Sequence, residues 1–225
     1  MTEYNIRLIK DHILLVNGAE LLLVDTGSPL SCHEAGRIDL AGGHFSVPTS
    51  IPLYNIGADY LSEKIGEHVS GLVGMDIIRR FPVKIDVPGG KMTFGCSTEG
   101  MRRLPSSIGL MGYVLVDMTV NGRPARIVLD TGAPVSYVSP SFTEGLEAVG
   151  SATDFHPTLF GGSDSFETPI FEFPASFAGC GFSMKAGHLP AKEQLELSLL
   201  RASGVVGLEL FSRFPIAIAD GAVWA

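Results

Sequence analysis

Two short stretches of this 225-residue sequence place an aspartate at the end of an apolar run, where it could do acid–base chemistry. Leu21–Ser28 reads Leu-Leu-Leu-Val-Asp-Thr-Gly-Ser, and Ile127–Ala133 reads Ile-Val-Leu-Asp-Thr-Gly-Ala. Such apolar runs are typical of buried strands, and glycine permits a tight turn directly after them. A carboxylate at the end of a buried strand is unfavourable unless it has partners. We therefore expect the partner of Asp25 to be Asp130.

Two carboxyl groups held close together have complementary chemical roles. Like charges at short range cannot both form, so the pair shares one proton. The carboxylate can then activate a water molecule as a base, and the carboxylic acid can protonate a carbonyl oxygen. The threonine after each aspartate, Thr26 or Thr131, can hydrogen-bond to the opposite loop. The glycine that follows, Gly27 or Gly132, lets the backbone and a substrate approach closely.

The sequences around the two aspartates match in the same order. Val16–Gly18 and Val120–Gly122 both read Val-Asn-Gly and precede the aspartates. Residues 71–83 and 204–216 follow them, and both read Gly, two aliphatic residues, Gly, an aliphatic residue and an acid, ending in Arg-Phe-Pro-aliphatic. Three matching blocks in one order indicate an internal duplication.

The duplication predicts how the chain is organised. We expect two similar lobes, residues 1–100 and 108–225, joined by a linker over 97–109 and related by a pseudo-two-fold axis near the aspartates. The 27 glycines and 14 prolines favour many turns and a β-rich fold. One chain supplies both aspartates, so we expect a monomer to suffice.

A few short helices are expected between the strands. Their predicted positions are residues 60–68, 77–80 and 192–200. The leucines expected to pack the third helix are Leu195, Leu199 and Leu200.

The second half contains a longer connection, which we interpret as a lid. More residues separate Asp130 from Gly204 than separate Asp25 from Gly71. Part of the additional length, residues 153–173, is typical of a long hairpin. Its glycine-rich tip could close over the site, or it could point away as an ordinary surface hairpin. The tip residues considered for substrate binding are Gly161, Gly162 and Ser163.

Composition excludes several classes of function. The net charge is −8 and no basic cluster occurs, so we expect no nucleic-acid partner. The three cysteines are widely spaced, which favours reduced thiols. We see no signal peptide and no apolar segment of membrane-spanning length, so we expect a cytoplasmic protein without a membrane partner. The six histidines are isolated in sequence, and we expect no metal and no other cofactor.

The doubled Asp-Thr-Gly motif resembles the retropepsin and pepsin superfamily of aspartic peptidases. In each half the motif is followed by two aliphatic residues and a glycine, at Leu72–Gly74 and Val205–Gly207, and the resemblance covers both halves. It implies an all-β, bilobal, closed-barrel fold with an internal pseudo-two-fold duplication and a few short helices. Each motif would lie in a psi-shaped loop, through which the glycine-ending strand of the same half passes. Asp25 and Asp130 would be the catalytic dyad around a shared water molecule.

The same resemblance implies an aspartic endopeptidase that hydrolyses peptide bonds in a peptide or protein substrate. Thr26 and Thr131 would form interlocking hydrogen bonds, and Gly27 and Gly132 would line the cleft. The chain departs from retroviral enzymes, which usually carry aspartate where proline follows both motifs here. Its first half is also compressed between Asp25 and Gly71, so we expect no full flap there.

The residue after each motif predicts a difference between the two aspartates. A hydroxyl at Ser28 can donate to Asp25 and favour its ionised form, whereas Ala133 has no hydroxyl to donate to Asp130. We therefore expect Asp25 to be mainly the charged member of the pair and Asp130 mainly the protonated one.

Two other functions remain open. Aliphatic-Val-Asp-Thr-Gly also occurs in metallo-β-lactamase-type hydrolases, but that family needs a clustered histidine motif for zinc. A retropepsin-like fold could also bind a peptide or a partner protein without cutting it, because fold does not fix function. The presence of both aspartates argues against this silent binding protein.

Overall fold

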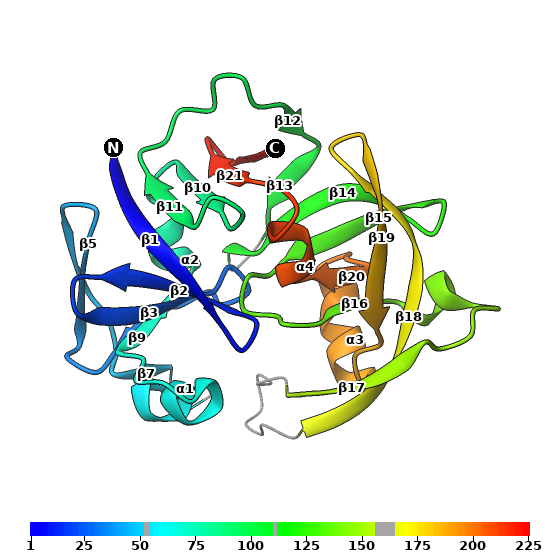
Figure 1. Ribbon diagram of the computed structural model, residues 1–225, viewed down its shortest axis with the longest axis horizontal. Coiled ribbons are helices and arrows are strands. Elements are labelled where there is room, and N and C mark those ends of the chain that lie inside the picture. Colours follow the sequence, from blue (N-terminus) through cyan, green and yellow to red (C-terminus); the bar gives the residue numbers. More distant parts are fainter. Residues whose placement is uncertain (52–54, 110–111, 156–164) are drawn as a thin grey trace.

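The computed structural model describes residues 1–51, 55–109, 112–155 and 165–225 (Figure 1). Strands make up about half of the described chain, with a few short helices between them. They form one ten-stranded and one eight-stranded sheet together with two small two-stranded sheets. The predicted all-β class is therefore confirmed. None of the described helices is long and apolar enough to cross a membrane.

The first half contributes mainly to the ten-stranded sheet. Its elements are β1 (Thr2–Ile9), β2 (His12–Asn17), β3 (Glu20–Val24), β4 (Cys32–His33), β5 (Arg37–Leu40), β6 (Gly43–Ser46), β7 (Ser50–Ile51), β8 (Ile56–Gly57), α1 (Ala58–Ile65), β9 (Gly71–Val73), α2 (Met75–Ile78), β10 (Val83–Asp86) and β11 (Lys91–Phe94).

The second half contributes the eight-stranded sheet and the last strands of the first sheet. Its elements are β12 (Arg103–Leu104), β13 (Ser106–Ile108), β14 (Val114–Val120), β15 (Arg123–Leu129), β16 (Ser136–Val138), the 3-10 helix η2 (Pro140–Thr143), β17 (Gly150–Phe155), β18 (Ser165–Phe177), β19 (Cys180–Gly187), α3 (Ala191–Leu199), β20 (Gly204–Val206), α4 (Leu208–Phe211), β21 (Ile216–Ala219) and β22 (Ala222–Trp224).

The strands that carry the Asp-Thr-Gly motifs are covered on both faces, which explains their continuous apolar sequence. Successive side chains of a strand point to opposite faces. Leu22 and Val24 of β3, with Ile127 and Leu129 of β15, therefore enter one core that both halves share. The alternate side chains of β3 and β15 enter two smaller cores, one in each half. The shared core thus fixes the ends of β3 and β15 relative to each other.

The same pairing surrounds both motifs. β3 runs parallel to β9, and β15 runs parallel to β20. The backbone N–H of Asp25 donates to Val73 O at 3.0 Å, and that of Asp130 donates to Val206 O at 3.0 Å. A short antiparallel strand on the far side, β4 or β16, completes each arrangement. In each half the glycine-ending strand therefore lies between the strand before the motif and the strand after it, and the motif loop joins those two outer strands.

The C-terminal hairpin joins the sheet of the first half. β21 pairs with β10, and β22 pairs with β12. Both chain ends lie at the top of Figure 1, where Arg102 N donates to Ala225 O at 2.8 Å. The expected linker over 97–109 is not free of structure, because it contains β12 and β13. The division into lobes 1–100 and 108–225 stays a prediction.

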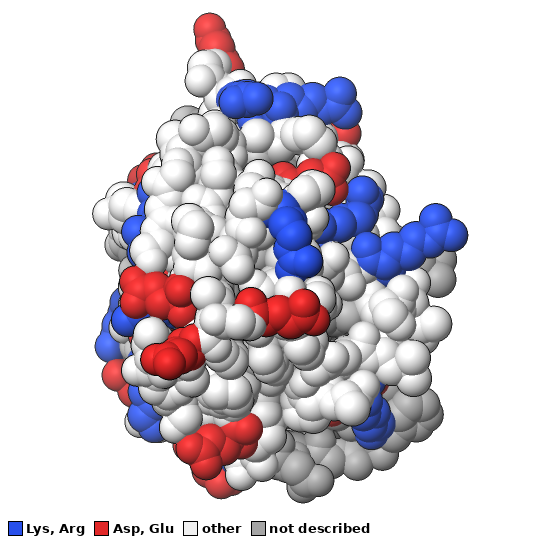
Figure 2. Space-filling view, turned by 90° about the vertical axis from the view of Figure 1, so that its right-hand side faces the viewer, with Lys and Arg blue, Asp and Glu red and all other residues white. Residues whose placement is uncertain are grey.

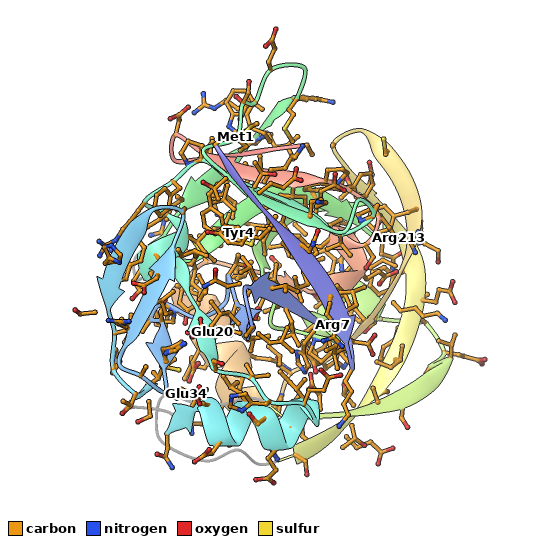
Figure 3. All side chains as sticks on the ribbon, turned by 60° about the vertical axis from the view of Figure 1, so that its left-hand side comes forward. Met1, Tyr4, Arg7, Glu20, Glu34 and Arg213 are labelled. Carbon is orange, nitrogen blue, oxygen red and sulfur yellow. The ribbon has the colours of Figure 1, made fainter. Side chains whose placement is uncertain are left out.

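Surface contacts of β1 connect it to neighbouring segments. Figure 3 shows Arg7 on β1 above α1, and its Nη2 lies 3.1 Å from Glu67 Oε1 just after that helix. Tyr4 on the same strand accepts a hydrogen bond at its hydroxyl from Ala41 N at 2.8 Å. Charged side chains of both signs are spread over the largely uncharged face shown in Figure 2.

The three predicted helices exist, with shifted ends. The prediction for the packed face of the third helix is correct for Leu200, which packs against the small core of the second half together with Leu197. It is wrong for Leu195 and Leu199, which are 64% and 79% exposed. The leucines of α3 are two to four residues apart, so either of two helix faces could be buried. The position of β20 and its neighbours decides which face packs.

Gly207 supports a prediction about stability. Its φ of −94° suits any residue, but a Cβ there would lie 2.0 Å from Ala133 O in the second motif loop. We expect Gly207→Ala to lower the free energy of unfolding by about 2 kcal/mol or more, because overpacking forces the backbone to shift. Urea denaturation measures this loss.

The matched control is Gly150→Ala. A Cβ at this position in β17 meets no atom within 4 Å, so stability should stay within about 1 kcal/mol of the wild type. An equal loss in both variants would contradict the steric explanation.

Candidate active site

The two aspartates begin equivalent turns at the ends of β3 and β15. Gly27 N donates to Asp25 Oδ1 at 2.8 Å, and Gly132 N donates to Asp130 Oδ1 at the same distance. These hydrogen bonds orient each carboxyl group within its own loop. The turns thereby point both carboxyl groups toward the junction between the two halves.

The two carboxyl groups meet at this junction. The carboxyl group of Asp25 forms a hydrogen bond with that of Asp130. A Cβ at Gly27 would lie 2.3 Å from the carboxyl group of Asp130, and one at Gly132 would lie 2.6 Å from that of Asp25. The glycines are therefore required by close approach, because any side chain would collide with the opposite aspartate.

The two threonines lock the loops to each other. Both are fully buried. Thr26 Oγ1 donates to Leu129 O at 2.9 Å and accepts from Thr131 N at 3.0 Å. Thr131 Oγ1 donates to Val24 O at 2.7 Å and accepts from Thr26 N at 3.0 Å. Each hydroxyl is satisfied as donor and acceptor, so the relative position of the two loops is specified by four buried hydrogen bonds.

Burial and pairing change the protonation of this site. Burial raises the pKa of Asp25 well above its ordinary value, and the negative charge and hydrogen bond of Asp130 raise it further. The backbone N–H groups of Gly27 and Ser28 act in the opposite direction but are smaller causes. A hydrogen bond between two carboxyl groups needs one proton, so the pair holds a proton at pH values where isolated carboxyl groups are ionised.

The expected hydroxyl contact of Ser28 is wrong. Ser28 Oγ donates to Leu30 O at 2.8 Å, within its own turn, and only its backbone N–H interacts with Asp25. Serine hydroxyls commonly bond to a carbonyl two residues away, and this local bond outcompetes the carboxylate. The serine hydroxyl therefore gives no reason for Asp25 and Asp130 to differ in charge.

A second pair of hydroxyls, not identified from the sequence, supports the loops. Ser31 Oγ accepts from Gly74 N at 2.9 Å, and Ser136 Oγ accepts from Gly207 N at 3.2 Å. Both serines follow their aspartate at the same distance along the chain, so the repeat itself could have identified them.

A cavity of about 390 Å³ opens at the two aspartates. Its walls include α1 from the first half and α3 from the second, which Figure 1 shows on different sides of the molecule. Most of the lining is apolar, including Leu23, Val128 and Val205. The candidate lid residues Gly161, Gly162 and Ser163 lie outside the described residues, so the lid stays a prediction.

Three polar side chains in this cavity were missed from the sequence. His12, Tyr137 and Asp154 all line it, and the hydroxyl of Tyr137 donates a short hydrogen bond to Asp154. Burial raises the pKa of Tyr137, and the charge of Asp154 adds to this effect. Burial lowers the pKa of His12, with Asp154 acting against it. These residues come from three separate strands, so no local spacing relates them.

The described part of the chain contains no cluster of metal ligands, which the metallo-β-lactamase-type alternative requires. Outside residues 52–54, 110–111 and 156–164, no three His, Cys, Asp or Glu side chains lie together as metal ligands. His156 is among the residues not described.

Comparisons with known proteins add little to this geometry. No protein-family model matches the sequence, and no curated protein matches it. Among solved structures, the chain is similar to a retropepsin-like aspartic protease from Rickettsia conorii with a TM-score of 0.36 and 11% identity. The similarity covers 56% of this chain and 89% of that chain. A likeness this remote carries no argument about function.

The raised pKa of Asp25 predicts how stability depends on pH. Between the ordinary carboxyl pKa and the raised one, the folded protein holds more protons than the unfolded chain, so its stability falls as pH rises. Asp25→Asn removes this effect. We expect the variant to have a higher free energy of unfolding than the wild type at about pH 7, with each pKa unit worth about 1.4 kcal/mol.

Urea denaturation between about pH 4 and pH 8 provides the measurement. Asp39→Asn is the control, because a hydrogen bond from His44 lowers the pKa of that exposed carboxyl, and its removal should bring no gain at neutral pH. If the Asp25→Asn variant is no more stable than the wild type at pH 7, the pKa of Asp25 is not raised.

Proposed function

We propose that this protein is an aspartic endopeptidase of the retropepsin and pepsin superfamily, with Asp25 and Asp130 as its catalytic dyad. The observation that carries the proposal is the hydrogen-bonded contact between these two carboxyl groups at the base of a cavity. A buried pair of carboxyl groups sharing a proton disfavours folding at neutral pH, and hydrolysis is a function that uses such a pair.

The proposed reaction uses the ionised and protonated members of the dyad together. The carboxylate accepts a proton from a water molecule, whose oxygen attacks the carbon of the peptide carbonyl. The carboxylic acid donates its proton to the carbonyl oxygen, which gives a tetrahedral diol. The dyad then protonates the amide nitrogen and takes a proton back from a diol hydroxyl as the carbon–nitrogen bond breaks, which releases a carboxylic acid and an amine. The dyad ends with one shared proton, as it began.

The surroundings of the dyad suit this role. The interlocked threonines hold the two carboxyl groups in fixed positions, as a preorganised catalytic pair requires. Gly27 and Gly132 let the two carboxyl groups come together, and both glycines line the cavity in which a substrate would lie. The mostly apolar lining lowers the local dielectric constant and so strengthens electrostatic interactions at the dyad.

The proposal extends to the organisation of the chain. The matched strand pairings around Asp25 and Asp130 support an internal duplication with a pseudo-two-fold axis between them. Because both halves of the dyad come from one chain, a monomer is sufficient for activity. The substrate is a peptide or an extended segment of a protein.

A digest of a randomised peptide library tests the activity. The wild type should cleave peptides, and Asp25→Asn and Asp130→Asn should each reduce the cleavage rate by about 10²–10⁴-fold, the usual contribution of an acid–base group. Mass spectrometry of the products gives the rates and the cleavage positions. Asp39→Asn, a substitution of the same kind at an exposed position of strand β5, should leave the rate unchanged.

Two results would overturn the proposal. Cleavage that persists in both dyad variants would assign the activity to another group or a contaminant. Peptide binding by the folded wild type, without cleavage across acidic and neutral pH, would instead support the silent binding protein.

A further inference from the structure

Helix α3 buries an acidic side chain in the cavity wall while two of its leucines are largely exposed. Glu193 is only 8% exposed, whereas Leu195 and Leu199 on the same helix are 64% and 79% exposed. A surface helix normally has the opposite arrangement, and glutamate is rarely buried unless it is paired. The burial of Glu193 therefore points to a ligand that balances its charge.

One carboxyl oxygen on each of two glutamates of this helix is buried without a hydrogen-bond partner among the described residues. Glu193 Oε2 and Glu196 Oε1 are both buried and accept no hydrogen bond there. Glutamates three residues apart lie on the same side of a helix, and both line the cavity that contains Asp25 and Asp130. Two carboxyl groups at this wall thus have unused hydrogen-bonding capacity.

The charge of the whole cavity favours a cationic ligand. Of the described residues that line it, five carry carboxyl groups and one is a lysine. Lys64 lies on α1, in the wall contributed by the first half, whereas the two glutamates lie in the wall contributed by the second. An added positive charge next to α3 would meet mainly negative neighbours.

The walls beside the glutamates are apolar. Leu189, Leu197 and Val205 belong to one small core and line the same cavity. A side chain with an aliphatic stem and a charged end fits this combination, because the stem packs on the leucines and the cation reaches the carboxylates. Lysine and arginine are the residues with this chemistry.

We propose that Glu193 and Glu196 form a specificity subsite for a lysine or arginine side chain of the peptide substrate. This inference rests on the proposed function, since the same cavity holds the dyad. Val205 links the proposed subsite to the dyad. It lines the cavity beside the glutamates, and on β20 it pairs with Val128, two residues before Asp130. A basic side chain bound at α3 would therefore belong to a residue close to the bond that is cut.

Paired peptides test the subsite directly. The probes are otherwise identical peptides, chosen from sequences that the library digest shows to be cut, with lysine or norleucine at the selected position. Norleucine keeps the aliphatic stem and lacks the ammonium group. We expect the wild type to cut the lysine peptide with a kcat/KM about 10–100-fold higher, the range of a hydrogen bond to a charged group.

Two single variants and a control locate the effect. Glu193→Gln and Glu196→Gln should each reduce the lysine-to-norleucine ratio several-fold, and the double variant should bring it close to one while norleucine peptides are still cut. Glu147→Gln makes the same change at an exposed position outside the cavity and should keep the wild-type ratio. A wild-type ratio near one, or a double variant that keeps the full preference, overturns the subsite.

A binding assay separates failure of the subsite from failure of the peptidase proposal. Lysine-fixed and norleucine-fixed peptide libraries are titrated against Asp25→Asn and against the Asp25→Asn protein carrying both glutamine substitutions. Tighter binding of the lysine library, lost in the combined variant, supports the subsite even if the wild type cuts no peptide. Equal binding of both libraries overturns the subsite, whether or not cleavage occurs.

Discussion

The contact between two carboxyl groups in the protein interior is the constraint on which this structure depends. Such a contact needs a shared proton, and it needs backbone that can come within van der Waals distance of each carboxyl group. Gly27 and Gly132 meet the second need because they have no side chain. Thr26 and Thr131 prevent the loops from separating, through hydrogen bonds that cross between the halves.

The sheets transmit this constraint to the rest of the molecule. Strands β3 and β15 share one core, so the ends that carry the aspartates are positioned by packing and not by the loops alone. Strands β9 and β20 lie parallel to them and supply the carbonyl oxygens that accept hydrogen bonds from Asp25 N and Asp130 N. The cavity forms where this rigid base meets the two helices. Because its lining is mostly apolar, charged groups in the cavity interact more strongly with one another than the same groups would at the surface.

The sequence by itself determined the features that depend on local pattern. Apolar runs ending in Asp-Thr-Gly specify buried strands followed by tight turns, and their repetition specifies that Asp25 and Asp130 are partners. The many glycines and prolines favoured turns, and a glycine-containing turn does join β10 and β11. The all-β class follows from the same evidence. The catalytic roles of the two aspartates stay a proposal, because strand and turn patterns determine position and not reaction.

The three-dimensional structure decided what the short-range pattern left open, both within a turn and between distant segments. The hydroxyl of Ser28 had two acceptors in reach of its turn, and the nearby carbonyl of Leu30 was selected over Asp25. The leucines of α3 allowed either of two faces to pack, and the small core of the second half selected the one that buries Glu193. His12 and Asp154 reach the cavity from separate strands, with no shared spacing in the chain. A short-range pattern records which residues share a face of one element, but the chemical surroundings of a buried group come from every element that packs around it.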